Sequence, residues 1–492
     1  MTAVAAPEVV SRVVPDSTAT GPRFGWLRDR GMGASILVAA LSSAFGVVLV
    51  EATAYIGAML QADPYIGDSG TLAVVVAILS VLLIGVALYV AAIVTANTFA
   101  TIVAGRTRRI ALMRLIGATA RSQRAEVAGH GFIVGLIGAV AGLVSGLLIS
   151  GIGLLVADRL LGAVPDFTLV QPTILIPAAG VALTTWVAAW AGSRRVLSVT
   201  PLQAIAGSVE RTHEDAAARP ARHVGALVLL ILGAALLVFG VLIGLVTPLG
   251  VVVAFLGGLL SFTGISLAAV VVMPPLLRLV GRLLGRSATA RLAAENALRY
   301  PERSSRMAIG VVMGVTLVTM FAIALESVKV MLNSASGGAL DSDFSLIMDS
   351  FAAVMMVLVG ISAVIAAVGL VNLLTIGVVQ RRRELGLLRA VGLSNRQIRG
   401  MILLEAVHIT VTATVTGLVL GVLYGWIAAQ SLLGSVRMPP DFDRTAGLIA
   451  PSVPWLPVVI IVAATAVLTL VAAAAPTRLA TRVAPVEALA VD

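Results

Sequence analysis

The fold of this chain is decided by a stretch that occurs twice: residues 106–124 read RTRRIALMRLIGATARSQR, and residues 381–399 read RRRELGLLRAVGLSNRQIR. The two copies align without a gap at a constant offset (381 − 106 = 275). In each copy, arginines at helical spacing are interleaved with apolar residues, and a glycine followed by Thr or Ser interrupts the pattern. The recurring positions include Arg106, Arg108, Arg114, Gly117 and Arg121, which return as Arg381, Arg383, Arg389, Gly392 and Arg396. This pattern predicts a short amphipathic helix at a membrane surface in each half of the chain.

The same register extends outward from both copies. It pairs Gly142 with Gly417 and Glu51 with Glu326. Near the ends of the two halves, TPLQAI at 200–205 matches APVEAL at 484–489 at a larger offset (484 − 200 = 284). The second half has therefore gained nine residues (284 − 275), which we place in the loop before its last helix. A repeat of this length makes the chain an array of two similar units.

The composition is that of an integral membrane protein. The chain is 59% hydrophobic and 12% charged, and its mean hydropathy is +1.05, which is far too apolar for a soluble domain. Segments long enough to cross about 30 Å of hydrocarbon as a helix lie near 32–60, 71–104, 126–157, 173–193, 224–246, 249–277, 307–332, 345–379, 401–433 and 453–475. They predict an all-α integral membrane fold with about ten transmembrane helices.

The arginines predict the orientation. In the ten-helix topology the arginine-rich segments, including both copies of the repeated stretch, fall on one side, while most aspartates of the loops fall on the other. Because cationic loops stay in the cytoplasm, we expect both termini and both copies to be cytoplasmic. The net charge of +10 is then a topology signal, and no nucleic-acid partner is expected.

The repeat and the composition divide the chain into four parts. We expect a cytosolic tail at 1–31, a first four-helix repeat at 32–206, a connecting region at 207–305 and a second four-helix repeat at 306–492. The connecting region holds a hydrophilic linker, two extra transmembrane helices and an amphipathic surface helix at 286–306 that Pro301 breaks. An even number of helices separates the two repeats, so they should be parallel and related by a pseudo-two-fold axis along the membrane normal.

No chemistry of its own is visible in the chain. A phosphate-binding loop for ATP needs a lysine, and the single lysine, Lys329, lies in no such motif. The four histidines form no zinc-like spacing, and the absence of cysteine excludes disulfides and thiolate metal sites. We therefore expect a non-enzyme with no metal site, and any energy from ATP would come from a separate subunit.

The segments GRTRRIALMRLIGATARSQRAEVAG (105–129) and QRRRELGLLRAVGLSNRQIRGMILLEA (380–406), each followed by a glycine-rich helix and closed by PLQAI or PVEAL, resemble the FtsX-like permease domain. That domain belongs to ABC transporters of the macrolide-exporter (MacB), lipoprotein-release and bacitracin-resistance kinds. The resemblance covers two copies and leaves out the N-terminal tail and the two extra helices. Copy one differs in having Arg109 where copy two has Glu384.

The resemblance implies a mechanism of energy coupling. In such permeases the segment between the second and third helices docks on the ATPase, which assigns this role to the ten recurring positions above and to Glu384. The implied partner is a dimer of ABC ATPase subunits on the cytosolic side, which would bind ATP and Mg; membrane lipids and an accessory envelope protein are further candidate partners. The simpler interpretation is that the arginines only lie over lipid phosphates.

By the same resemblance the chain would be the permease subunit of a transporter that exports or extracts a hydrophobic or amphipathic substrate. A lipid, a lipopeptide, an antimicrobial peptide or a drug would fit. The alternative is an FtsX-like transmembrane regulator that signals to cell-envelope enzymes without transporting anything. A secondary transporter is disfavoured, because it would carry ionisable residues deep in the bilayer, whereas these helix centres are nearly free of charge.

Two carboxylates in equivalent positions form a second candidate site. Glu51 and Glu326 lie toward the outer end of the first helix of each repeat, and Lys329 follows Glu326 by three residues. A charged group inside the membrane costs about 2.5–3.5 kcal/mol at the centre and less near the interface. The three residues are candidates for an outer gate or a substrate contact. The alternative is that the two glutamates are a duplicated relic that stays hydrated at the level of the lipid headgroups.

Overall fold

The computed structural model describes most of the chain from residue 32 to residue 482. The described residues are 32–61, parts of 74–96, 112–161, 167–193, 220–283, 287–299, 301–335, 387–435 and 437–482, with short gaps at 114, 390, 439–443 and 446. The predicted span at 345–379 and both chain ends therefore lie outside the described residues. The cytoplasmic location of the termini and the predicted tail at 1–31 remain predictions.

Nearly all the described structure is helical. The elements are α1 (Met32–Gln61), α4 (Ala120–Leu161), η2 (Pro172–Ile174), α5 (Leu175–Gly192), α9 (Pro220–Gly244), α10 (Gly250–Leu283), α11 (Ala288–Arg299), α12 (Pro301–Ala335), α15 (Asn395–Leu433), β1 (Arg437–Met438), β2 (Arg444–Thr445) and α16 (Trp455–Arg482). Seven described helices are long and apolar enough to cross a membrane, and two shorter apolar helices, Val81–Val90 and Trp455–Val471, lie where further spans are predicted. The all-α membrane fold is confirmed, whereas the number ten remains a prediction.

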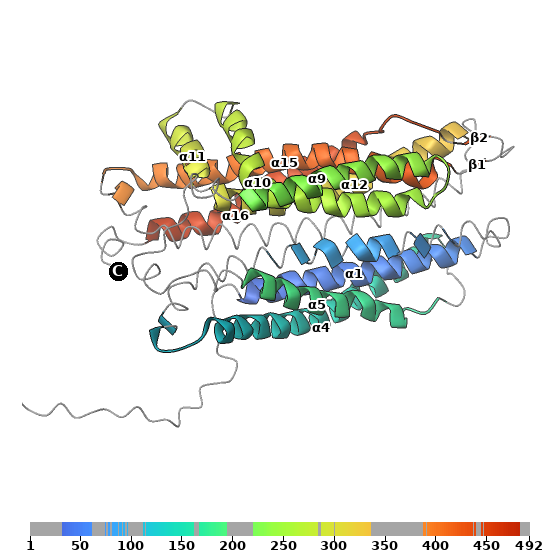
Figure 1. Ribbon diagram of the computed structural model, residues 1–492, viewed down its shortest axis with the longest axis horizontal. Coiled ribbons are helices and arrows are strands. Elements are labelled where there is room, and N and C mark those ends of the chain that lie inside the picture. Colours follow the sequence, from blue (N-terminus) through green and yellow to red (C-terminus); the bar gives the residue numbers. More distant parts are fainter. Residues whose placement is uncertain are drawn as a thin grey trace, which may run out of the picture.

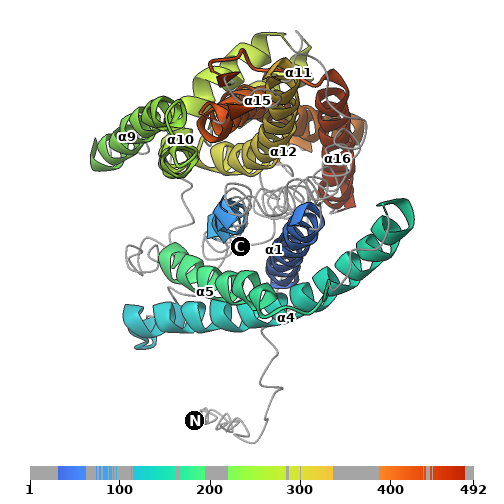
Figure 2. The same cartoon turned by 90° about the vertical axis from the view of Figure 1, so that its right-hand side faces the viewer.

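The helices form two groups that run side by side. Figure 1 shows α9, α10, α12 and α15 in one group and α1, α4 and α5 in the other, and Figure 2 shows the same separation in the view turned by 90°. The short helix α11 and the beginning of α4 lie at one end of the molecule, and the strands β1 and β2 lie at the other. In the predicted topology these are the cytosolic and outer ends, respectively.

Glycines on α4 and α15 give the two repeats the same internal packing. A Cβ atom placed on Gly142 would fall against the carbonyl oxygen of Ala40, and one on Gly417 would fall 2.8 Å from Cβ of Val315. Ala40 and Val315 are themselves equivalent in the repeat (315 − 40 = 275). Close approach through glycine is how helices associate in lipid, where apolar surface alone gives no preference for protein over lipid. The repeat found in the sequence is thus a repeat of helix contacts, α1 on α4 and α12 on α15.

The two extra helices, α9 and α10, form a tight antiparallel hairpin, as the turn at residues 247–250 predicts. A Cβ on Gly240 would lie 2.7 Å from Cβ of Ala254, and one on Gly257 would lie 2.7 Å from the backbone nitrogen of Leu237. The first residue of α10, Gly250, is likewise packed against the end of α9. Such close backbone approach leaves little freedom for one helix to slide on the other.

Helix α10 contacts both repeats. On one side, the hydroxyl of Ser261 in α10 lies 2.8 Å from the hydroxyl of Tyr424 in α15. On the other, the hydroxyl of Tyr89, in the short helix that follows α1, donates to the carbonyl of Leu259 over 3.1 Å and lies 2.8 Å from the hydroxyl of Thr263. The extra hairpin therefore bridges the repeats, a role that the sequence alone did not indicate.

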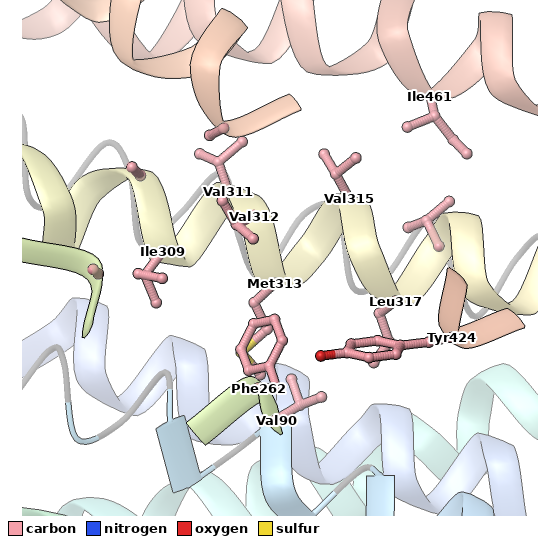
Figure 3. Close-up of a cluster of buried hydrophobic side chains, with 14 of the residues drawn as sticks. Val90, Phe262, Ile309, Val311, Val312, Met313, Val315, Leu317, Tyr424 and Ile461 are labelled. Carbon is pink, nitrogen blue, oxygen red and sulfur yellow. The ribbon is translucent and has the colours of Figure 1, made fainter. Parts of the chain in front are cut away.

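The main apolar core lies around this bridge. Phe262 of α10, Met313 of α12, Tyr424 of α15 and Val90 of the first repeat lie close together in Figure 3, and all four belong to one buried cluster. Because residues of both repeats and of the hairpin share this cluster, the described part of the molecule has one continuous interior rather than two separate ones.

Two smaller predictions concern the connections. The amphipathic helix expected at 286–306 is present as α11, and Pro301 begins α12 where the break was expected. The loop before the last helix is longer in the second half, since residues 434–454 separate α15 from α16 whereas residues 162–174 separate α4 from α5. The longer connection carries the small antiparallel pair of β1 and β2. The domain boundaries assigned from the sequence remain predictions.

Candidate functional site

The repeated arginine-rich segments break at their glycines in the same way. Gly117 has a φ of 107° and Gly392 a φ of 108°, a region that side chains with a Cβ avoid. Two residues later, Ser394 caps α15: its hydroxyl accepts from the backbone nitrogen of Gln397, whose side chain accepts in return from the backbone nitrogen of Ser394. In the first copy the hydroxyl of Thr119 accepts from the backbone nitrogen of Ser122 over 3.1 Å. Each segment is thus a helical turn, a left-handed glycine and a capped long helix.

This geometry corrects the extent of the predicted amphipathic helix. The sequence predicted a short amphipathic helix interrupted at the glycine and the next transmembrane helices from about residues 126 and 401, but residues 120–124 and 395–399 are already the first turns of α4 and α15. At 1.5 Å per residue, α4, with 42 residues, is about 63 Å long, roughly twice the hydrocarbon thickness. The glycine break therefore joins directly to a helix that runs through the whole molecule.

About half of the proposed ATPase-contact residues can be located. Arg121 and Arg396 are exposed at equivalent positions in the first turns of α4 and α15, and Arg389 is partly buried just before the break at Gly392. The others lie outside the described residues: Arg106, Arg108, Arg114, Arg381, Arg383 and Glu384. Whether these side chains contact an ATPase remains a prediction.

The structure adds a pair of apolar residues that the charge pattern did not single out. Ile116 is 79% exposed and its equivalent Val391 is 74% exposed (391 − 116 = 275). Leu112 and Leu387, one turn earlier in each copy, are also exposed. Exposed apolar side chains next to a backbone break are typical of interaction surfaces. The repeat was a usable signal, because a β-branched apolar residue directly precedes the glycine in both copies.

The two copies of the segment pack against different neighbouring helices. In the second copy, Ala293 of α11 packs with Ile398, Met401 and Ile402 at the start of α15, and Leu388 and Leu393 pack against the same cluster. In the first copy the start of α4 is held against the end of α5, where the guanidinium of Arg124 lies 3.9 Å from the centre of the Trp190 ring. The pseudo-symmetry of the segments is therefore not a symmetry of their surroundings.

The two glutamates also differ. Glu51 is 3% exposed, and neither of its carboxylate oxygens has a hydrogen-bond partner in the part of the chain that the structure describes. Glu326 and Lys329 are only partly buried. Glu51 lies one turn beyond Val47, which packs against Gly146 of α4. Such burial does not fit a hydrated carboxylate at headgroup level. The assignment of Glu51, Glu326 and Lys329 to a gate or a substrate contact remains a prediction.

The described histidines and carboxylates do not gather into a metal site. No group of three or more of them lies together within the described ranges. Nδ1 of His408 lies 2.6 Å from the carbonyl oxygen of Leu404, one turn earlier in the same helix.

Comparison with known proteins gives matches in both halves. The family model "FtsX-like permease C-terminal" matches residues 81–201 and 356–485, which together cover just over half of the chain. The second match begins 275 residues after the first (356 − 81) and ends 284 residues after it (485 − 201). These are the two offsets found in the sequence repeat, so the family match and the repeat describe the same units.

Two curated proteins are similar over short stretches. The ABC transporter permease YtrF of Bacillus subtilis (strain 168) is 32% identical over 87 residues, 18% of this chain and 19% of that protein. The macrolide export ATP-binding/permease protein MacB of Bdellovibrio bacteriovorus is 30% identical over 102 residues, 19% of this chain and 16% of that protein. The matching stretches span less than a fifth of either relative.

Proposed function

Because this chain belongs to the FtsX-like permease family, we propose that it is the membrane subunit of a bacterial ABC transporter in which a separate subunit hydrolyses ATP. Within that complex, ATP and Mg would be bound by the partner subunit. The chain itself would supply the transmembrane pathway in the cytoplasmic membrane. Its similarity to an ABC transporter permease and to an ATP-binding/permease protein supports this role.

The observation that carries the proposal is the pair of equivalent breaks at Gly117 and Gly392, each with an exposed apolar residue before it. Ile116 and Val391 present the same kind of side chain at the same step of the repeat. Two such points, which the predicted pseudo-two-fold axis of parallel repeats would relate, suit a partner that is itself a two-fold dimer. Each apolar side chain would fill a pocket of one ATPase subunit, and the surrounding arginines would orient the encounter.

The long helices explain how such docking could move the membrane part. Each break leads within three residues into α4 or α15, and these helices pack along α1 and α12 through glycines. A displacement of the docked turn would therefore be passed to the helix as a rigid element. The glycine seams, by which we mean the close contacts of Gly142 with α1 and of Gly417 with α12, would transmit the displacement to the first helix of each repeat.

The substrate that we propose is hydrophobic or amphipathic and is exported or extracted from the membrane. The absence of charge from most helix centres favours an apolar path. The carboxylate of Glu51, which is buried and has no partner among the residues that the structure describes, favours a substrate that carries a cationic group. Lipids, lipopeptides, antimicrobial peptides and drugs all include such molecules.

The docking proposal is tested with Ile116→Asp, Val391→Asp and the double variant. We expect each single variant to weaken co-purification with the ATPase and the double variant to abolish it, together with ATPase stimulation in the reconstituted complex. The matched control is Val246→Asp, which places a carboxylate at another highly exposed apolar position, in the turn between α9 and α10. The proposal would be refuted by a double variant that is present in the membrane and binds the ATPase like the parent.

One feature favours the alternative of a transmembrane regulator. Ile449, which follows β2, is held against α15, since Nε1 of Trp426 donates to the carbonyl of Ile449 over 2.6 Å and the backbone nitrogen of Ile449 donates to Oε1 of Gln430 over 3.2 Å. A fixed backbone at the predicted outer end is a suitable contact for an envelope protein. Replacing residues 437–445 by a Gly-Ser linker distinguishes the two functions. If the chain is a transporter, the variant should keep the substrate-stimulated ATP hydrolysis of the parent. If the chain is a regulator, the variant should lose its effect on the activity of envelope enzymes.

A further inference from the structure

We propose that the α4–α5 pair binds the headgroup of an anionic phospholipid of the cytoplasmic leaflet, with Arg124 as the phosphate ligand. The inference is independent of the ATPase and of the transported substrate. It rests on the orientation of one arginine, on a strip of exposed aromatic rings beside it, and on the contrast with the second repeat.

Arg124 is held in one orientation by α5. Its guanidinium lies 3.9 Å from the centre of the Trp190 ring, and its Nε and Nη2 donate to the carbonyl oxygen of Trp190 over 3.4 and 3.3 Å. The third nitrogen, Nη1, makes no hydrogen bond to any residue in the described ranges. A guanidinium fixed in this way keeps donors for a phosphate oxygen and has already lost much of its side-chain entropy.

The surroundings of Arg124 fit a phosphate better than a carboxylate of the protein. Among the residues that the structure describes, no acidic side chain forms a salt bridge with Arg124. The nearest acidic residue in sequence, Glu126, instead accepts a hydrogen bond from the side chain of Gln123 over 3.2 Å. A second exposed cation, Arg121, precedes Arg124 by one helical turn. Among the described residues, the charge that faces an external anion at this place is therefore positive.

Exposed aromatic rings continue from this cation along the helix pair. Trp190 and Trp186 lie one turn apart on α5, and Trp186 meets Phe132 of α4 edge to face with ring centres 6.5 Å apart. All three rings are exposed, and Figure 2 shows α4 and α5 on the side of the molecule away from the second repeat. Trp190 is two residues from the end of α5, where tryptophan marks the boundary between hydrocarbon and headgroups. An acyl chain would lie along the rings while its headgroup reaches Arg124.

The second repeat serves as an internal comparison. At the positions equivalent to the three rings it has Val407, Leu470 and Ala474, although the equivalent of Arg124, Arg399, is conserved between the copies. The aromatic strip is thus a property of one repeat and is not required by the shared helix packing. Both copies have the arginine, but the contact of this arginine with a tryptophan at the end of an aromatic strip is found in the first copy.

The test uses the full chain, purified in a zwitterionic detergent and titrated with phosphatidylglycerol while its thermal unfolding is followed. We expect phosphatidylglycerol to raise the unfolding temperature and phosphatidylcholine to have a much smaller effect, because a ligand that binds only the folded state stabilises it. Arg124→Gln removes the charge and should weaken the phosphatidylglycerol response by about tenfold in midpoint concentration. Trp190→Leu should weaken it as well, because the guanidinium loses its platform.

The matched control is Arg399→Gln, which removes the equivalent charge from the second repeat and should keep the response of the parent. Inorganic phosphate at the same concentration should not reproduce the shift, since it lacks the acyl chains. The proposal is overturned if Arg124→Gln and Arg399→Gln respond alike to phosphatidylglycerol, or if phosphate alone gives the full shift. If Arg124→Gln is too unstable to purify, Arg124→Lys replaces it, because lysine keeps the charge but cannot stack its side chain on the Trp190 ring. The proposed geometry is contradicted if Arg124→Lys and Trp190→Leu both keep the midpoint concentration of phosphatidylglycerol found for the parent.

Discussion

Gly117 and Gly392 adopt the same left-handed backbone conformation, with φ of 107° and 108°, although 275 residues separate them (392 − 117). Neither position is crowded, because a Cβ placed on either glycine would meet nothing within 4 Å. The requirement for glycine is therefore one of backbone conformation. It identifies the two breaks as equivalent joints in front of α4 and α15.

This conformation predicts the effect of replacing either glycine. Gly117→Ala and Gly392→Ala should each destabilise the break by about 1–2 kcal/mol, because a Cβ is unfavourable in the left-handed region. We expect reduced ATPase coupling at normal membrane levels, measured as substrate-stimulated ATP hydrolysis. Gly400→Ala, in the helical part of α15 with open space around it, is the control. Wild-type coupling in the double alanine variant would contradict this role.

The glycine seams predict a different kind of defect. Gly142→Leu and Gly417→Leu insert a side chain where the neighbouring helix backbone lies, and overpacking of this kind typically costs about 1–3 kcal/mol. Both variants should unfold at lower temperature in detergent. Gly129→Leu on α4 should behave like the parent, since a side chain there enters open space. Equal stability of the three variants would show that the seams are not close-packed.

The contact between α10 and the first repeat predicts a measurable coupling. Tyr89→Phe and Thr263→Val each remove one hydroxyl of the pair that is 2.8 Å apart. A double-mutant cycle on the free energy of unfolding should give a coupling of about 0.5–1.5 kcal/mol, the usual net value of a buried hydrogen bond. Strictly additive effects would mean that the two hydroxyls do not interact.

The burial of Glu51 predicts an unequal response of the two glutamates. Glu51→Gln should lower transport of a cationic substrate more than Glu326→Gln does, because Glu51 is buried whereas Glu326 is only partly buried. Transport and ATP hydrolysis are measured at matched membrane levels. If both single variants and the double variant transport and hydrolyse ATP like the parent, neither glutamate has a functional role.

The orientation in the membrane is tested by cysteine labelling in a chain that has no cysteine of its own. Cysteines at Ser69 and Ser342 should react with an impermeant thiol reagent in intact cells, and one at Ser122 should not, because the arginine asymmetry places it in the cytoplasm. Reaction at Ser122 would reverse the topology and remove the basis for cytosolic docking.

The sequence predicted those features that depend on local pattern and on the repeat. The apolar segments identified the described helices, the repeat paired Gly142 with Gly417, which make equivalent helix contacts, and the loop expected to be longer in the second half is longer there. These predictions succeed because lipid imposes helix on apolar segments and because each copy of the repeat confirms the other.

Features that depend on contacts between distant helices were not predictable. Nothing in the pattern around Tyr89 indicated that it would bond to α10, since the two lie 174 residues apart (263 − 89). The difference between Glu51 and Glu326 was hidden for the same reason: equivalent positions in a repeat need not have equivalent neighbours. The exposure of Ile116 and Val391 was not predictable either, because an apolar residue in an amphipathic segment is normally expected on the buried face.

The hairpin of α9 and α10 has a consequence for biogenesis. It is synthesised after the first repeat and before the second, and it can close on its own because its contacts are local in sequence and rely on backbone approach at glycines such as Gly240 and Gly257. A completed hairpin already offers Thr263 to the helix of Tyr89 and Ser261 to a helix not yet made. Each later helix of the second repeat would thus enter the bilayer beside a finished protein surface, so that a chain with two repeats of the same helix packing is guided toward a single order of assembly.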